Sequence, residues 1–441
     1  MINLLFILIT ASLLFSERGN LISYTFKEER EASYIQIELE DYISDIGASS
    51  IITPNAIYDV RLYSIVYETI DQFGVFTQAS GSVAIPNNNN FAYPLYLFGH
   101  GTQIKRSSAP SMGGFNLLNQ WLPSKGFIYL EPDYLGLGIS EILHPYHLKD
   151  VTASTVIDML RAVKQFCNQT NFVQYNDQLF LAGYSEGGYA TMATHHIIER
   201  DYNNEFNITI SFPMAGAYSM SGIMVDLMLD QQPYGEPFYF PYVLFSYLDL
   251  YPDIGTLEEF LLPEYVGLYD LFDGYHSSVE INNAMPSIPI TIMKPEEILI
   301  FEEDENHPLR IALQVNDLWD WTPVSTMHIF HGEGDELVPV ENALLAYDQF
   351  LENGAEEVYL DLLPESYGGH QEVAPWTLFG AYQISQELKM INELGDVNQD
   401  SSISILDLVT MVNFILSGDS FETQGYLFWA GNVNLDGTVN I

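Results

Sequence analysis

Apolar and polar positions alternate with two different periods along most of this chain, and the order of the two periods predicts the fold class. Residues 58–69 and 74–86 alternate apolar and polar side chains, as two antiparallel strands joined by a tight turn do. Apolar residues recur at helical spacing over 152–166 and 189–200. Three continuously apolar runs predict buried parallel strands: YPLYLFGHG (93–101), GFIYLEPDY (126–134) and QLFLAGYS (178–185). Alternation of strands and helices predicts a mostly parallel sheet with helices on both faces.

This alternation stops after the predicted strand at 207–216 and returns at about residue 326, with a strand, a helix over 341–354 and a strand over 358–364. The interval of about 216–322 is far longer than an ordinary connection, so we expect an inserted cap. Eight aromatic residues lie within 233–251. They are expected either to line a ligand pocket, since such pockets are apolar, or to form the core of the cap.

A nucleophile is predicted at Ser185, in the pentad Gly183-Tyr184-Ser185-Glu186-Gly187. The pentad matches G-x-S-x-G, follows an apolar strand and opens a helix, which is the setting that this motif requires. Small residues permit a tight, strained turn that exposes the serine hydroxyl at the end of the sheet. A surface serine in a glycine-rich turn is the alternative.

A serine hydroxyl needs a base to activate it and a carboxylate to orient that base. In this motif's fold, the chain order is serine, acid, histidine. Asp335 follows the predicted strand at 326–332, and Glu333 is its rival for the acid. His370 comes after the strand at 358–364 in a Gly-Gly-His loop, and we expect it to be the base.

Backbone N–H groups must stabilise the oxyanion that forms during acyl transfer. One donor is expected from Glu186, the residue after the nucleophile, and a second from Gly101 or Thr102 in the loop after a strand. Glu186 would serve through its backbone, although its charge stands beside the oxyanion. No cofactor is needed for such a reaction.

Six separated motifs, in this order, resemble the secretory lipase-like branch of the α/β-hydrolases. They are YDVRLYSIVYET through ASGSVAIP, HGT (100–102), PDYLGLG (132–138), HPYHL (144–148), GYSEGG (183–188) and HGEGDELVP (331–339). The resemblance covers about residues 57–390. It implies an α/β-hydrolase fold with a helical cap and carboxylester hydrolysis by Ser185, Asp335 and His370. The family also includes other acyl hydrolases and peptidases, so the substrate stays open.

The C-terminal 393–441 carries a duplicated loop with the spacing of calcium-binding loops. The first copy places oxygen-bearing side chains at loop positions 1, 3, 5, 9 and 12, before an apolar helix: Asp396, Asn398, Asp400, Ser404 and Asp407. The second copy repeats the pattern with Asn432, Asn434, Asp436 and Asn440. The pair resembles a type I dockerin, which implies bound Ca²⁺ and a cohesin-type partner. The second loop breaks off at position 10, so we expect a longer protein.

The composition and net charge of the chain limit the classes of protein to which it can belong. The chain has 14 Lys+Arg against 59 Asp+Glu, a formal net charge of −45, and only three of its basic residues lie beyond residue 200. Such a field repels phosphate backbones and excludes a nucleic-acid partner. Its 47% hydrophobic content suits a globular protein with a large core, and its single Cys excludes an internal disulfide framework.

Residues 2–15 form an apolar run that is too short to cross a bilayer and fits a secretory signal, so 1–16 is expected to be a signal peptide and the protein to be exported. No other segment is apolar enough to span a membrane. The chain is therefore expected to be a secreted lipase or esterase over 17–392, acting on a small or lipid ester. The alternatives are a polysaccharide-directed acyl esterase, a serine peptidase, or a non-catalytic adhesion module.

Overall fold

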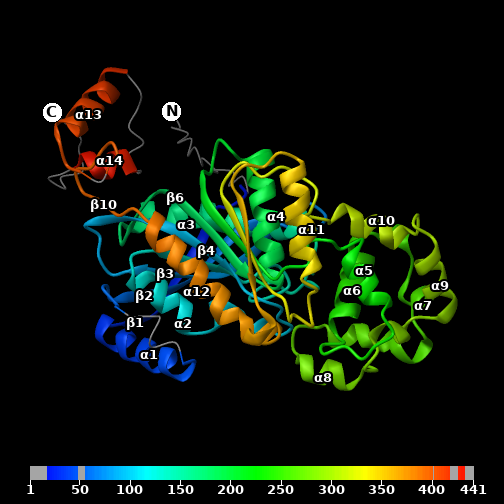
Figure 1. Ribbon diagram of the computed structural model, residues 1–441. Helices are drawn as coiled ribbons and strands as arrows, with labels where there is room; N and C mark the ends of the chain where they lie inside the picture. Colours follow the sequence, from blue (N-terminus) through cyan, green and yellow to red (C-terminus); the bar gives the residue numbers. More distant parts are fainter. Residues whose placement is uncertain (1–16, 48–54, 401, 418–425, 433–441) are drawn as a thin grey trace, which may run out of the picture.

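A computed structural model describes residues 17–47, 55–400, 402–417 and 426–432. The predicted signal segment 1–16 lies outside the described residues. A ten-stranded sheet forms the centre of the molecule, in the order β1-β2-β3-β5-β4-β6-β7-β8-β9, with β10 paired to β4 (Figure 1). The strands are β1 (Leu21–Arg30), β2 (Val60–Ile70), β3 (Phe76–Pro86), β4 (Phe91–Gly99), β5 (Ile128–Pro132), β6 (Gln174–Tyr184), β7 (Ile208–Met214), β8 (Met327–Gly332), β9 (Val358–Leu363) and β10 (Asn392–Glu393).

The sheet is antiparallel on one side and parallel on the other. β1, β2, β3 and β5 pair antiparallel, whereas β5, β4, β6, β7, β8 and β9 run parallel. The carboxyl ends of the parallel strands therefore meet at one edge, which is where ligand sites of such sheets lie.

Helices cover both faces of the sheet, and each face has its own apolar core. The helices are α1 (Ala32–Asp45), α2 (Leu117–Ser124), α3 (Lys149–Thr170), α4 (Glu186–Asp201), α11 (Glu341–Glu352) and α12 (His370–Leu388). One core joins α3, α4 and α11 to strand residues such as Leu179 and Leu181. The other joins α1, α2 and α12 to Phe180 and Ala182. Successive residues of β6 thus enter opposite cores, as the period of a strand requires. The predicted mixed α/β architecture is confirmed.

Between β7 and β8 the chain leaves the sheet and forms a group of short helices beyond its carboxyl edge (Figure 1). They are α5 (Ile223–Leu229), α6 (Tyr239–Leu250), α7 (Leu257–Phe260), α8 (Ser278–Asn283), α9 (Pro295–Glu303) and α10 (Pro308–Val315). We call residues 215–326 the cap.

The C-terminal segment lies beyond the edge of the sheet opposite the cap, at the amino end of β4 (Figure 1). β10 pairs with the first two residues of β4, before the point where β5 begins to pair with the same strand. After it come α13 (Ile405–Ser417) and α14 (Tyr426–Gly431). A small apolar cluster joins Ala92 of β4 to Val397, Met411, Tyr426 and Ala430.

Candidate active site

The turn between β6 and α4 holds Ser185 in a strained conformation. Its φ of 60° and ψ of −120° lie outside the regions that residues with a Cβ ordinarily adopt. Such a conformation costs about 1–3 kcal/mol and persists only where the surroundings enforce it. Here the Ser185 N–H donates to the Met214 carbonyl of β7 at 2.9 Å, which fixes the turn to the neighbouring strand.

Contacts between backbone segments explain the glycines of the pentad. A Cβ on Gly183 would lie 2.2 Å from the Gly187 carbonyl oxygen, and a Cβ on Gly187 would lie 1.9 Å from that of Gly99. Backbone atoms cannot move aside as a flexible side chain can. Glycine is therefore required at both positions for α4 to start directly after β6 and against the end of β4.

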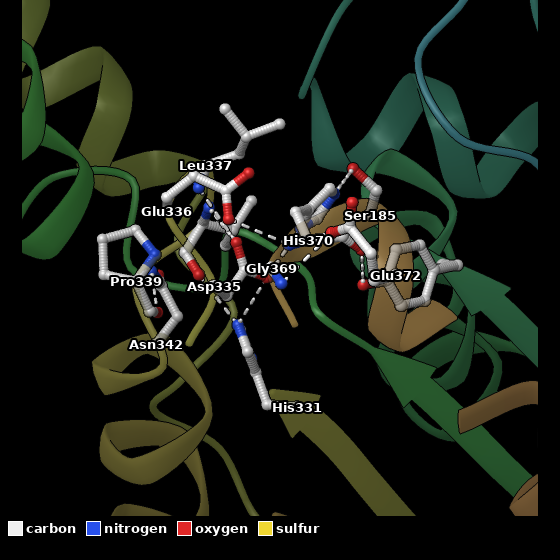
Figure 2. A network of polar contacts seen from close by, with 12 residues as sticks. Ser185, His331, Asp335, Glu336, Leu337, Pro339, Asn342, Gly369, His370 and Glu372 are labelled. Atoms are coloured by element: carbon white, nitrogen blue, oxygen red, sulfur yellow. Dashed lines mark hydrogen bonds and ion pairs between the residues drawn. The ribbon is translucent and has the colours of Figure 1, made fainter. Parts of the chain in front are cut away.

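The three residues of the predicted triad meet at the carboxyl edge of the sheet (Figure 2). His370, the first residue of α12, places its Nε2 2.9 Å from the Ser185 Oγ. Its Nδ1 lies 2.6 Å from Oδ2 of Asp335, in the loop after β8. A carboxylate only accepts, so Nδ1 carries the proton and Nε2 is free to accept the proton of Ser185.

Asp335 is held as an anion by donors on all sides. Its Oδ1 accepts the N–H groups of Leu337 and Val338, at 3.0 and 2.8 Å. His331 Nε2 lies 3.3 Å from Oδ2 (Figure 2). Burial alone would raise the pKa of Asp335, but the hydrogen bonds from His331 and His370 outweigh it and lower the pKa well below the usual value. The rival acid Glu333 is exposed.

Backbone groups surround the position where an oxyanion would form. Gly101 lies beside the nucleophile, since a Cβ built on it would be 3.7 Å from the Ser185 Cβ. Glu186 is the first residue of α4, and the first N–H groups of a helix have no acceptor within it. The Thr102 hydroxyl is 2.8 Å from the Tyr146 hydroxyl. Gly101 and Glu186 therefore both lie next to Ser185, and Thr102 follows Gly101 in the same loop.

An apolar cavity opens from Ser185 into the cap and holds about 620 Å³ of space, its open mouth included. Its walls are mainly aliphatic and aromatic: Ala217, Met220, Met224, Leu227, Met228, Tyr234, Tyr239, Phe240, Val243, Pro289, Leu337 and Val338. Other aromatic residues of 233–251, such as Phe245 and Tyr247, are buried in the cap itself. The aromatic segment therefore contributes both to the wall of the cavity and to the apolar core.

A second, polar hollow adjoins the first. Tyr239 lines both, and the second extends past Thr102 and Gln371, the residue after His370. Its remaining walls are Gln103, Ile104, Lys105, Ser108, Glu236, Phe238, Ser277 and Ser278.

Another serine, histidine and carboxylate lie together in the core. His195 Nδ1 is 2.7 Å from the Ser211 Oγ, and its Nε2 is 2.9 Å from Glu199. Ser211 lies inside β7 and is 0% exposed. No substrate can reach a hydroxyl so placed, which leaves Ser185 as the better candidate.

Sequence reasoning missed His144, which contacts the residue that follows Ser185. Its Nε2 is 2.6 Å from the side chain of Glu186, and both side chains are 3% exposed. The contact between His331 and Asp335 was likewise not predicted from the sequence. The only sequence signal for either was its place in a family motif, HPYHL or HGEGDELVP.

The first predicted calcium loop gathers hard oxygen donors, the ligand type that Ca²⁺ takes. Asp400 N donates to Oδ1 of Asp396 at 3.1 Å, and Asn398 Nδ2 donates to Oδ2 of Asp400 at 2.8 Å. Asp407 instead accepts backbone N–H groups, among them that of Ser404 at 2.6 Å. The donor set fits Ca²⁺ by its chemistry. Within residues 17–47, 55–400, 402–417 and 426–432, no three His, Cys, Asp or Glu side chains are arranged to hold a metal ion.

In the second predicted loop, Asn432 follows α14, and its N–H donates to the Trp429 carbonyl. Asn434, Asp436 and Asn440 lie outside the described residues. As for membranes, none of the helices in the described part of the chain has both the length and the apolar character needed to span a bilayer.

Solved structures that resemble this fold include a candidate hydrolase, an esterase and a lipase. A candidate hydrolase from Legionella pneumophila is 27% identical, with a TM-score of 0.75 over 83% of this chain and 98% of that one. The rice cell wall degrading esterase LipA from Xanthomonas oryzae is 25% identical, with a TM-score of 0.73 over 84% and 98%. Candida antarctica lipase A, at 18% identity and a TM-score of 0.60 over 85% and 83%, shares the fold alone.

No protein-family model matches the sequence, and no curated protein matches it. At a coarse level, the structural likenesses support a carboxylester hydrolase of the α/β-hydrolase type.

Proposed function

We propose that this protein is a secreted serine carboxylester hydrolase in which Ser185 is the nucleophile, His370 the base and Asp335 the orienting acid. One observation carries the proposal: the continuous chain of contacts from Ser185 Oγ through His370 to Asp335, at 2.9 and 2.6 Å. The strained serine and the apolar cavity beside it support it.

In the first half-reaction, the Ser185 Oγ attacks the ester carbonyl while His370 Nε2 takes its proton. The tetrahedral oxyanion accepts hydrogen bonds from the backbone N–H of Glu186 and from that of Gly101 or Thr102. As the intermediate collapses, the ester C–O bond breaks and His370 returns the proton to the departing alcohol. Asp335 stays ionised and stabilises the imidazolium. Water then repeats these steps on the acyl-enzyme and releases the acid.

We predict that Ser185→Ala abolishes hydrolysis of p-nitrophenyl esters, with kcat reduced by about 10⁴-fold or more. Among the described residues that line the cavity, Ser185 is the only serine, threonine or cysteine. Steady-state kinetics and labelling with a fluorophosphonate, in which the Ser185 oxygen displaces fluoride from phosphorus, measure the loss. Ser211→Ala is the matched control, since it removes the serine of the buried set, and it should keep both activity and labelling. Undiminished activity of Ser185→Ala would refute the assignment.

The same measurements separate the alternatives. Faster turnover of aminoacyl amides than of esters would indicate a serine peptidase. A wild-type protein that neither hydrolyses esters nor reacts with the fluorophosphonate would be an adhesion module.

A second candidate substrate class is an acyl ester of a polysaccharide. The polar hollow past Thr102 and Gln371 favours it, because the alcohol leaves from the side of His370, where Gln371 lies. The similarity to a cell wall degrading esterase supports the same idea. A panel of p-nitrophenyl esters graded by acyl length, together with acetylated xylan, tests it. Preference for long-chain esters, with acetylated xylan untouched, would favour a lipase.

We further propose that the protein is exported and that residues 393–441 form a dockerin-like module. Ca²⁺ would be held by Asp396, Asn398, Asp400, Ser404 and Asp407, and would order the loop before α13. The exposed apolar side chains of Ile405 and Leu406, at the start of α13, suit a cohesin-type partner. Amino-terminal sequencing of the secreted protein tests the export signal.

A further inference from the structure

The side chain of Glu186 presents an electrostatic problem. Its backbone N–H is a proposed oxyanion donor, yet its carboxylate is 3% exposed in the first turn of the same helix. Its Oε2 has no hydrogen-bond partner among the described residues. A negative charge so near a developing oxyanion, in a site shielded from water, would oppose the transition state. Catalysis therefore requires that this charge be cancelled.

His144 supplies the cancelling charge. Its Nδ1 lies 2.6 Å from the Leu135 carbonyl, which only accepts, so Nδ1 carries a proton. Its Nε2 lies 2.6 Å from Oε1 of Glu186, and that contact needs a second proton between the two atoms. Burial alone would raise the pKa of Glu186, but His144, together with smaller contributions from His100 and His147, outweighs burial and lowers it. Either position of that shared proton leaves the pair with no net charge.

The surroundings fix His144 from two sides. A Cβ on Gly136, whose φ is 82°, would lie 2.4 Å from the His144 Cα, so the glycine permits the histidine's loop to approach. From the cap, the Ser246 hydroxyl of α6 donates to the His144 carbonyl at 2.8 Å. The Tyr242 ring, one turn earlier on α6, lies 5.6 Å from the imidazole. His144 thus connects the cap to the first turn of α4.

We propose that His144 is a positioning residue of the ester-hydrolysis site, which neutralises the Glu186 carboxylate and holds the Glu186 N–H toward the oxyanion. This inference rests on the proposed function, because it concerns the same reaction. His144 touches neither Ser185 nor the substrate cavity, so it acts through Glu186 alone.

Charge cancellation is tested by a double-mutant cycle on His144→Gln and Glu186→Gln, with p-nitrophenyl butyrate as substrate. His144→Gln leaves the carboxylate without its counter-charge, so kcat should fall by about 30-fold, with KM changed less than about threefold. Glu186→Gln removes the charge itself, so its kcat should exceed that of His144→Gln by at least about tenfold. The double variant should recover kcat at least about tenfold over His144→Gln, because nothing is left to neutralise.

A purely structural role predicts the opposite, namely a double variant no better than His144→Gln. That result, or an unchanged kcat in His144→Gln, would overturn the inference. If His144→Gln fails to fold, shown by its circular dichroism, the comparison of the double variant with Glu186→Gln decides: equal kcat supports the inference, and a further large loss contradicts it.

The second buried pair on the same helix provides the matched control. His195→Gln disturbs the His195–Glu199 contact, which lies about three turns further along α4 than Ser185, and should leave kcat within about threefold. A loss as large as that of His144→Gln would show that any damage to α4 suffices, against our inference. Ser185→Ala is measured alongside. If it stays active, the proposed function fails; if it is inactive while His144→Gln is fully active, only this inference fails.

Discussion

Single residues at the end of β6 decide whether the site can form, because three backbone segments meet there without intervening side chains. The strain at Ser185 is maintained by its hydrogen bond to Met214 and by the glycine contacts on either side. Reactivity at this site thus depends on residues that carry no functional group.

We predict that Gly187→Ala destabilises the fold by about 3 kcal/mol or more and abolishes ester hydrolysis, because the new Cβ would overlap the Gly99 carbonyl. Thermal unfolding followed by circular dichroism measures the first effect. Gly267→Ala, a position with no atom within 4 Å of the added Cβ, is the control and should unfold like the wild type. A Gly187→Ala protein as stable and active as the wild type would contradict our explanation of the motif.

At this scale the sequence predicted the residues that follow a local rule and missed those that depend on packing. Ser185 lies in a recognisable pentad, and His370 follows a strand in a glycine-rich loop. The neighbouring sequence therefore identifies both residues. His144 lies 42 positions before Glu186. Only the fold brings the two residues together, and no sequence pattern around either residue predicts their contact.

Strands and helices could be predicted from the sequence where one face of the element is buried and the other is more exposed, because the two kinds of residue then alternate with a regular period. β2 alternates between buried and half-buried residues along its length, which is the period that identified it. β1 is exposed or half-buried throughout, so it lacks that alternation and was not predicted. The cap helices are short, down to the four residues of α7, too few to show a helical period.

Helix α4 begins at the predicted active site, and its C-terminal end contacts the segment before β8. Substitutions at that end can therefore change stability without changing the site. There Glu199 accepts hydrogen bonds from His195 and from the N–H groups of Val324 and Ser325, which lead into β8. Burial alone would raise the pKa of Glu199, but these donors outweigh it and lower the pKa to about 2.

A carboxylate with a lowered pKa stabilises the folded state above its unfolded pKa, and the effect is lost as the pH falls through the folded value. From 4.5 to about 2, the shift corresponds to about 3 kcal/mol at neutral pH. We therefore predict that Glu199→Gln lowers the free energy of unfolding by up to about that amount at pH 7, and by less at pH 3, with kcat unchanged. Urea unfolding at both pH values measures it. An equal loss at both would show that charge is not the cause.

At the scale of the whole molecule, acidic residues far outnumber basic ones, and the excess lies mainly beyond residue 200, where the cap and the C-terminal segment are. Such a distribution favours neutral substrates over anionic ones through long-range repulsion. The same charge would attract divalent cations to the predicted calcium loop. There Asp396, Asp400 and Asp407 lie within twelve residues, with Asp407 in the first turn of α13.

We predict that the whole protein binds Ca²⁺, seen as a saturable heat in calorimetric titration that EDTA abolishes, because the loop offers oxygen ligands alone. Asp400→Asn should weaken binding at least about tenfold by removing one ligand charge. Asp177→Asn is the control, since Asp177 contacts Gln399 from β6 but has no place in the loop pattern. Equal Ca²⁺ affinity in both variants, or no binding by the wild type, would rule out this loop as the site.

Strand β4 connects the C-terminal segment to the predicted active site. Its first residues pair with β10, and its last, Gly99, leads into the loop of Gly101. Nine residues of strand separate those ends by about 30 Å. If the proposed cohesin-type partner binds α13, it would contact the molecule at the end remote from the predicted active site. Tethering of this kind would leave the path of a bulky, immobile substrate unobstructed.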